Sequence, residues 1–166
     1  MISISFIQKL GFSITWPIVL VGWQGPGNFH RQLTLKDVQQ FAEQSITSAD
    51  KEEIPDVAEL TMSCDEQLVD EALKRLAAED TQRALDIWIV VLLKQLVENL
   101  PQDPLAGMQE LTSFWSHFDY PARSPHIIQG VKNSIDPEDY YTARNYDEAI
   151  ASHKKWLVDE IARIQS

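Results

Sequence analysis

The fold is decided by residues 81–100, which read TQRALDIWIVVLLKQLVENL. The middle of this segment, residues 87–93, is apolar on every side, a pattern that a surface helix does not tolerate. The segment is therefore either the central helix of a bundle or a buried strand. Its length and the polar residues at its two ends favour the helix, and Pro101 ends it. We expect an all-α fold with a central apolar helix at about residues 80–100.

Helical spacing of apolar residues continues through most of the chain. One apolar stripe covers residues 35–46 behind an N-cap at Thr34, and a second covers residues 68–77. The last helix is expected to begin at Asn145, because Glu148 then occupies the capping-box position. Helix starts of the Asp-Pro or Ser-Pro type stand at residues 103–104, 124–125 and 136–137.

Residues 18–33 fit the helical pattern less well. The segment Gln24-Gly25-Pro26-Gly27-Asn28 is a turn or loop, and a short hairpin with strands at 18–23 and 29–33 is an alternative to helix here. No repeat and no low-complexity linker divides the chain. We therefore predict a single-domain multi-helix bundle over residues 1–166, with a short hairpin near residues 18–33 as an alternative to helix there.

The charge of the chain is concentrated in one segment. Residues 50–80 hold eleven of the 25 carboxylates and three basic residues, which gives this segment −8 of the total net charge of −11. A field of this sign repels nucleic acid and anionic lipid and attracts cationic partners. Composition thus argues against binding to nucleic acid or membranes and favours a basic protein as the partner.

Two interpretations of the acidic segment stay open. It is either a solvated face or a surface that binds a partner. Asp70–Lys74 and Glu71–Arg75 have the spacing of ion pairs within a helix, so they balance part of the charge locally. The remaining acids have no evident local base except Lys51. We therefore take as candidate partner-binding residues Glu52, Glu53, Asp56, Glu59, Asp65 and Glu66.

The sequence contains no assembled catalytic or cofactor motif, so we expect a protein that is not an enzyme and has neither cofactor nor metal. Cys64 stands beside two acidic residues, a setting that does not activate a thiol nucleophile. An enzyme would need a pocket that gathers His117, Asp119, His126 or Tyr140, whose spacing matches no short metal or catalytic motif.

The apolar run at residues 87–93 is far shorter than the roughly 20 residues that span a bilayer, and the lone cysteine fits a reducing cytoplasm. Trp88, Trp115 and Trp156 fit apolar stripes and are expected in the core. Trp16 and Trp23 flank a short apolar run, and either could be an exposed anchor for a partner.

One motif late in the chain carries a family resemblance. The sequence FDYP at residues 118–121, followed by His126 and two isoleucines, resembles a family of uncharacterised small bacterial helical proteins. Residues 33–38 and the Trp88 helix are also similar to it, so the resemblance covers most of the chain. Proteins of this kind look like the immunity proteins that accompany bacterial polymorphic toxins. The resemblance implies no catalytic residues.

Together, charge and resemblance predict a non-catalytic cytoplasmic protein that binds another protein, with an immunity protein facing a basic toxin domain as the specific form. The alternative is a helical structural or adaptor protein whose acidic face serves solubility. The oligomeric state stays open at this point.

Overall fold

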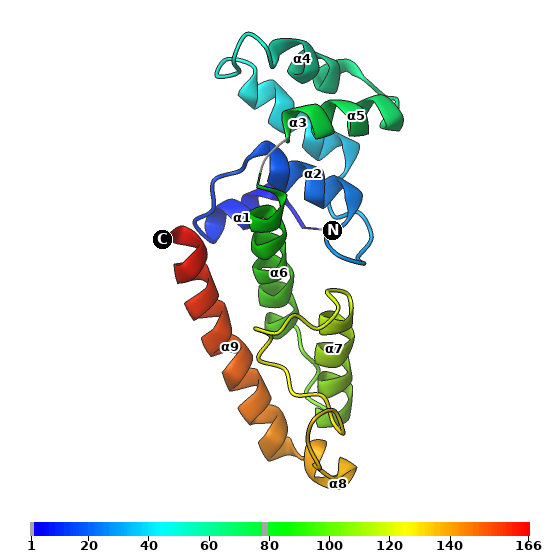
Figure 1. Ribbon diagram of the computed structural model, residues 1–166, viewed down its shortest axis with the longest axis vertical. Helices are drawn as coiled ribbons and strands as arrows, with labels where there is room; N and C mark the ends of the chain where they lie inside the picture. The colour runs from blue at the N-terminus through cyan, green and yellow to red at the C-terminus, as the bar shows by residue number, and fades with distance from the viewer. Residues whose placement is uncertain (1, 78–79) are drawn as a thin grey trace. The chain divides into compact units, whose positions relative to one another are not determined.

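The computed structural model describes residues 2–77 and 80–166, and the regular structure in these residues is α-helix throughout (Figure 1). No strand occurs among them, so the predicted all-α fold is confirmed. The chain forms two compact units, Met1–Val91 and Leu92–Ser166. The boundary lies within the central helix α6 (Thr81–Glu98), which was predicted from its apolar middle. That residues 1–166 form a single domain stays a prediction.

The described residues of unit 1 form five helices before α6. Helix α4 packs against both of its neighbours in the sequence, α3 and α5 (Figure 1). Helix α5 also packs against α2. The two expected apolar stripes form α3 and α5, and the Thr34 side chain caps α3 as predicted. The helices are α1 (Ile4–Lys9), α2 (Trp16–Gln24), α3 (Leu35–Ser45), α4 (Ile54–Met62) and α5 (Glu66–Leu76).

The hairpin considered for residues 18–33 does not form, because residues 16–24 are helical. Pro17 stands in the first turn of α2, where a missing N–H costs nothing. Gly25 ends the helix with a φ of 101°, a conformation that favours glycine. The chain then returns along α2, and the N–H groups of Gln32 and Leu33 donate to the carbonyl of Gly22 at 2.8 and 3.1 Å.

Gly22 allows α2 to approach the central helix closely. A Cβ at this position would lie 2.3 Å from Cζ2 of Trp88 and 2.9 Å from Leu33. The Trp88 ring is fully buried, and its indole N–H donates to the carbonyl of Ile18 at 2.8 Å. The predicted core position of Trp88 is therefore confirmed, and it organises unit 1.

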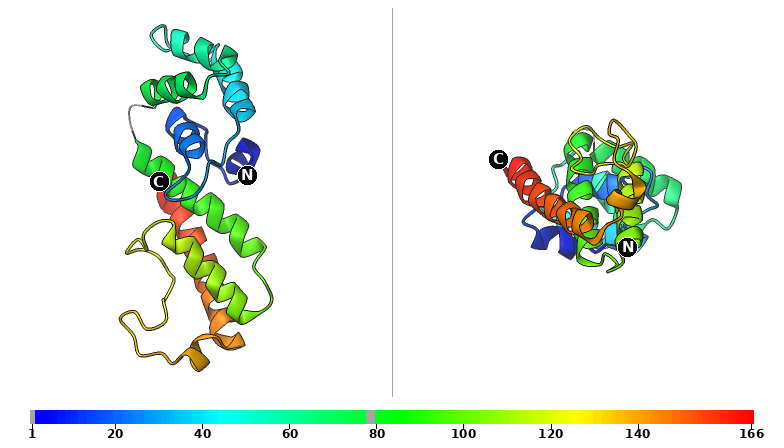
Figure 2. Two further views of the ribbon diagram at one scale, coloured as in Figure 1. Left: turned by 90° about the vertical axis from the view of Figure 1, so that its right-hand side faces the viewer. Right: turned by 90° about the horizontal axis from the view of Figure 1, so that it is seen from below.

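Unit 2 is built on the contact between α7 (Pro104–Ser116) and α9 (Ala143–Gln165), with the short α8 (Pro137–Tyr140) packed on α9. The Asp-Pro start at residues 103–104 is confirmed, since Asp103 caps α7. Trp115 is fully buried and Trp156 is half-buried. Residues 117–136, drawn largely in yellow, contain no helix (Figure 2).

The sequence prediction differs from the structure at two helix starts and misses two helices. The Ser-Pro pair at 124–125 starts no helix, because this segment lies in the irregular connection. Helix α9 begins at Ala143, capped by Thr142, and Glu148 binds Arg144 instead of completing a capping box. Helices α1 and α4 were not predicted, since each is short and Pro55 in the first turn of α4 obscures its apolar spacing.

Within the described residues, no helix combines the length and the apolar composition that crossing a bilayer requires.

Candidate functional site

The six carboxylates predicted to bind a partner lie on α4, at the start of α5 and in the turn before α4. The packing of α4 against α5 places them on one helix pair. Glu79, another acid of the acidic segment, lies outside the described residues. We call the six residues the acidic α4–α5 surface: Glu52, Glu53, Asp56, Glu59, Asp65 and Glu66.

Arg75 of α5 neutralises part of the acidic α4–α5 surface. Its Nη2 atom lies 2.8 Å from Oδ1 of Asp56 and 3.3 Å from Oε2 of Glu59. The hydrogen bond to Asp56 raises the pKa of Arg75, and the contact joins α5 to α4. The sequence paired Arg75 with Glu71 and found no local base for the two α4 acids. In the structure, Arg75 forms ion pairs with Asp56 and Glu59, and Glu71 acts on it through its charge. Asp56 and Glu59 lie 19 and 16 residues from Arg75, so spacing along one helix does not reveal these contacts.

Arg31 binds a third member of this surface. Its two terminal nitrogens bind both carboxylate oxygens of Glu66, at 2.9 and 3.1 Å, and this hydrogen bonding lowers the pKa of Glu66. The guanidinium also lies 3.5 Å from the ring centre of Trp23 and donates to the carbonyl of that residue. Arg31 therefore fastens the start of α5 to the end of α2, which is a structural task.

Asp70 on α5 is also paired, as the sequence predicted. It binds Lys74 one turn along the helix and accepts a hydrogen bond from Gln24 at 2.9 Å. Burial raises the pKa of Asp70, but the hydrogen bonds from Lys74 and Gln24 outweigh burial and lower it overall.

The other three acids form no ion pair among the described residues. Asp65 caps α5 by accepting from the backbone N–H of Gln67 at 2.9 Å. Glu53 accepts from the backbone N–H of Asp50 at 3.2 Å. Glu52 is exposed and makes neither a hydrogen bond nor an ion pair with described residues. The uncompensated charge of the surface thus lies at the starts of α4 and α5.

Exposed apolar side chains occur on the same two helices. Met62, the last residue of α4, is 83% exposed, and Ile54 and Leu68 are also exposed near the starts of α4 and α5. A flexible thioether side chain adapts to irregular protein surfaces. The α4–α5 helix pair therefore carries both acidic and exposed apolar side chains.

The structure distinguishes the two tryptophans that sequence could not. Trp23 is buried, with 2% of its surface exposed. Trp16 is half-buried, and its ring meets Phe41 of α3 nearly at right angles, with ring centres 4.7 Å apart. Trp16 also lines a cleft of about 310 Å³ together with Glu53. A candidate anchor therefore stands beside one of the predicted acids.

In unit 2, the half-buried His126 lies beside the buried His153, with ring centres 5.5 Å apart. His153 accepts from the indole N–H of Trp115 at 2.9 Å, and its Nδ1 donates to the carbonyl of Ala149. Burial lowers the pKa of His126 to about 4, with the neighbouring His153 as the second cause. Burial also lowers the pKa of His153. Neutral rings in a close-packed site fit a structural role.

Three of the residues that an enzyme would have to gather make hydrogen bonds within unit 2, and Thr112 acts on both His126 and Tyr140. His117 binds the carbonyl of Ser113, whereas His126 binds the hydroxyl of Thr112 at 2.8 Å. Tyr140 is buried and donates to the carbonyl of Ile127 at 2.7 Å. No group of three His, Cys, Asp or Glu side chains that could hold a metal occurs among residues 2–77 and 80–166.

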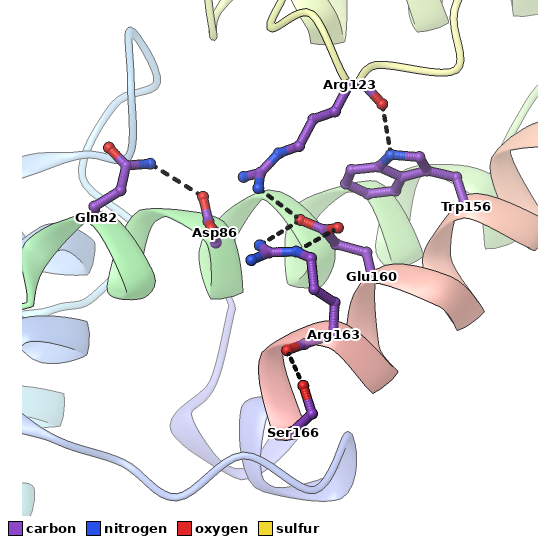
Figure 3. A network of polar contacts seen from close by, with 7 residues as sticks. All are labelled: Gln82, Asp86, Arg123, Trp156, Glu160, Arg163 and Ser166. Carbon is purple, nitrogen blue, oxygen red and sulfur yellow. Dashed lines mark hydrogen bonds and ion pairs between the residues drawn. The ribbon is translucent and has the colours of Figure 1, made fainter.

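A buried carboxylate in unit 2 escaped the sequence analysis. Glu160 of α9 is 6% exposed and binds Arg163 at 2.8 Å and Arg123 at 3.2 Å (Figure 3). The indole N–H of Trp156 donates to the carbonyl of Arg123 at 2.7 Å. In unit 1, Gln82 donates to the buried Asp86 one turn along α6. Two guanidinium groups offset the Glu160 charge, so this network ties the irregular connection to α9.

These features describe an all-α protein with an acidic, partly apolar surface on α4 and α5. The chain belongs to the family described as "Uncharacterized protein conserved in bacteria (DUF2247)", whose model matches residues 4–161. This match confirms the resemblance to an uncharacterised bacterial family. The likeness to immunity proteins stays a prediction. Comparison with curated proteins and with solved structures finds no match.

Proposed function

We propose that this protein is a non-catalytic binding protein whose acidic α4–α5 surface takes a basic protein partner. In the specific form of the proposal, the partner is a bacterial toxin domain and the protein is its immunity protein. It acts in the cytoplasm, needs no cofactor, and neutralises the toxin by covering it.

The observation that carries this proposal is the charge left after pairing. Residues 50–76 and Arg31 together hold nine carboxylates and four cations, which leaves a net charge of −5. Ion pairs within the chain occupy Asp56, Glu59, Glu66 and Asp70. Glu52, Glu53 and Asp65 are left to act on a partner, and exposed apolar side chains accompany them on the same helices.

An acidic inhibitor suits a toxin that acts on nucleic acid. Such a toxin must bind phosphate groups and therefore carries lysine and arginine in its site. Complementary potentials steer the encounter, raise the association rate and disfavour wrong partners. The proposal thus explains why the excess charge is concentrated in one segment of the chain.

The test combines genomic position with binding. Immunity proteins are encoded beside their targets, so the product of the adjacent gene is co-expressed with this protein and the complex is purified. The Kd of the complex is then measured by calorimetry. A triple variant, E52Q/E53Q/D65N, removes three uncompensated charges while asparagine still caps α5 and glutamine still accepts the Asp50 N–H. We expect binding to weaken by at least about tenfold, which corresponds to about 1.4 kcal/mol.

A matched control removes the same charge from unit 2. The exposed acids Glu110, Glu138 and Asp139 have no ion-pair partner among the described residues, so E110Q/E138Q/D139N changes net charge equally. Equal loss of binding in both variants would refute a local interface. A bound partner that keeps its activity would support the structural or adaptor protein instead of the immunity protein.

A further inference from the structure

We propose that a cleft between the start of α2 and the end of α3 receives an arginine or lysine side chain of the basic partner. We call it the Trp16 cleft. This inference rests on the proposed function, because it names the side-chain chemistry that the partner presents. The lining residues that carry the argument are Trp16, Pro17, Phe41, Ser45, Ala49 and Glu53.

The size and walls of the cleft fit one long side chain. Its volume of about 310 Å³ lies at the lower end of sites that hold small organic groups. Trp16 and Phe41 both line it, and their rings pack edge-to-face at 76° with centres 4.7 Å apart. Guanidinium and ammonium groups bind favourably over aromatic faces, most strongly over tryptophan.

Glu53 supplies the charge at this site. Its carboxylate accepts one hydrogen bond, from the backbone N–H of Asp50 to Oε2, and makes no ion pair with the described residues. None of the described residues that line the cleft is basic. A carboxylate that lines a cleft with two aromatic side chains, and that has no ion pair among the described residues, favours a cation from outside.

The ends of two helices modify the field but do not reverse it. The start of α2, at Thr15 and Trp16, carries a partial positive charge, and the last turn of α3, at Ser45, carries a similar partial negative charge. These contributions oppose each other. The full negative charge of Glu53 remains, so the cleft disfavours an anion. The last turn of α3 also contains no basic side chain of its own.

The first experiment uses the full chain and a capped tri-arginine peptide as the probe. Chemical-shift changes are followed by two-dimensional NMR, with the indole N–H of Trp16 and the amide of Glu53 as reporters. The control peptide contains citrulline, which keeps the shape of arginine without its charge. We expect saturable shifts at both reporters with arginine, and none with citrulline at the same concentrations. Equal shifts from the two peptides would overturn the inference.

Variants separate the cleft from the general acidic field. We expect E53Q and W16L each to weaken peptide binding by about fivefold or more. The exposed Glu43 lies on α3 outside the cleft lining, so E43Q removes the same charge as E53Q and is expected to leave binding within about twofold. Equal weakening by E43Q and E53Q would overturn the inference. Because E53Q retains the acceptor for Asp50, the conclusion does not depend on the folding of W16L.

The same variants distinguish this inference from the proposed function. If the adjacent gene product binds and E53Q and W16L leave its Kd unchanged, the proposed function stands and the cleft inference fails. If the arginine peptide binds in the cleft while no basic protein partner binds the chain, the cleft inference stands and the proposed function fails.

Discussion

Replacement of Gly22 by alanine tests how unit 1 is packed. A Cβ there would lie 2.3 Å from Cζ2 of Trp88, whereas carbon atoms in contact lie about 3.5–4.0 Å apart, so something must move by more than 1 Å. The Trp88 ring is fully buried, and its N–H is bound to the carbonyl of Ile18 at 2.8 Å, which prevents an easy retreat. Overpacking of this kind costs about 1–3 kcal/mol, and we expect the upper end.

Alanine also favours helix over glycine by about 1 kcal/mol, which offsets part of this cost. We therefore expect Gly22→Ala to lower the free energy of unfolding by about 2 kcal/mol. Urea unfolding followed by far-ultraviolet circular dichroism measures the difference through the transition midpoint. In a Trp88→Phe background the distal indole atoms are absent, so we expect the additional cost of Gly22→Ala to fall below about 1 kcal/mol. A Gly22→Ala protein as stable as the parent, or more stable, would refute the packing argument.

Three further predictions concern unit 2. Gly107→Ala places a Cβ 2.1 Å from the Tyr146 ring, so we expect a loss of about 1–3 kcal/mol in unfolding free energy, measured by urea titration; an unchanged midpoint would contradict the close approach. Burial lowers the pKa of His126 to about 4 and also lowers the pKa of His153, whereas both pKa values are near 6.5 in the unfolded chain. Protons therefore bind the unfolded state more strongly. The free energy of unfolding consequently falls as the pH drops from about 6.5 towards 4. We expect this fall to be clear between about pH 6.5 and 5 and reduced in His126→Asn, and an equal slope in both proteins would count against it. Thr142→Ala removes the cap of α9 and is expected to cost about 1 kcal/mol by the same titration, with Thr142→Ser close to the parent.

Much of the fold follows from local patterns in the sequence. The apolar run at residues 87–93 predicts α6, and Asp103 with Pro104 predicts the start of α7. Both signals come from residues that are adjacent in the sequence. Residues 16–24 were ambiguous because Pro17 and Gly22 are unfavourable within a helix in general. Both residues fit the helix α2, since Pro17 stands in its first turn and Gly22 packs against Trp88, which is distant in sequence.

In the candidate site, too, local features were predictable from the sequence and contacts between distant residues were not. The excess of acid at residues 50–80 is evident from composition, and so is the pair of Asp70 with Lys74. The ion pairs that balance the charges of Asp56 and Glu66 involve partners 19 and 35 residues away in the sequence, which no local spacing reveals. The sequence also could not choose between the two candidate tryptophans, because only tertiary packing buries one and leaves the other lining a cleft.

The central claim is that uncompensated acids of the acidic α4–α5 surface bind a basic protein. It is tested most directly by the Kd for the adjacent gene product as a function of salt, in the parent and in E52Q/E53Q/D65N. We expect the parent Kd to rise at least about tenfold between about 0.05 and 0.5 M NaCl, since screening shortens the reach of surface charge, and the triple variant to lose most of this dependence. A Kd that is indifferent to salt and unchanged in the triple variant would contradict the claim.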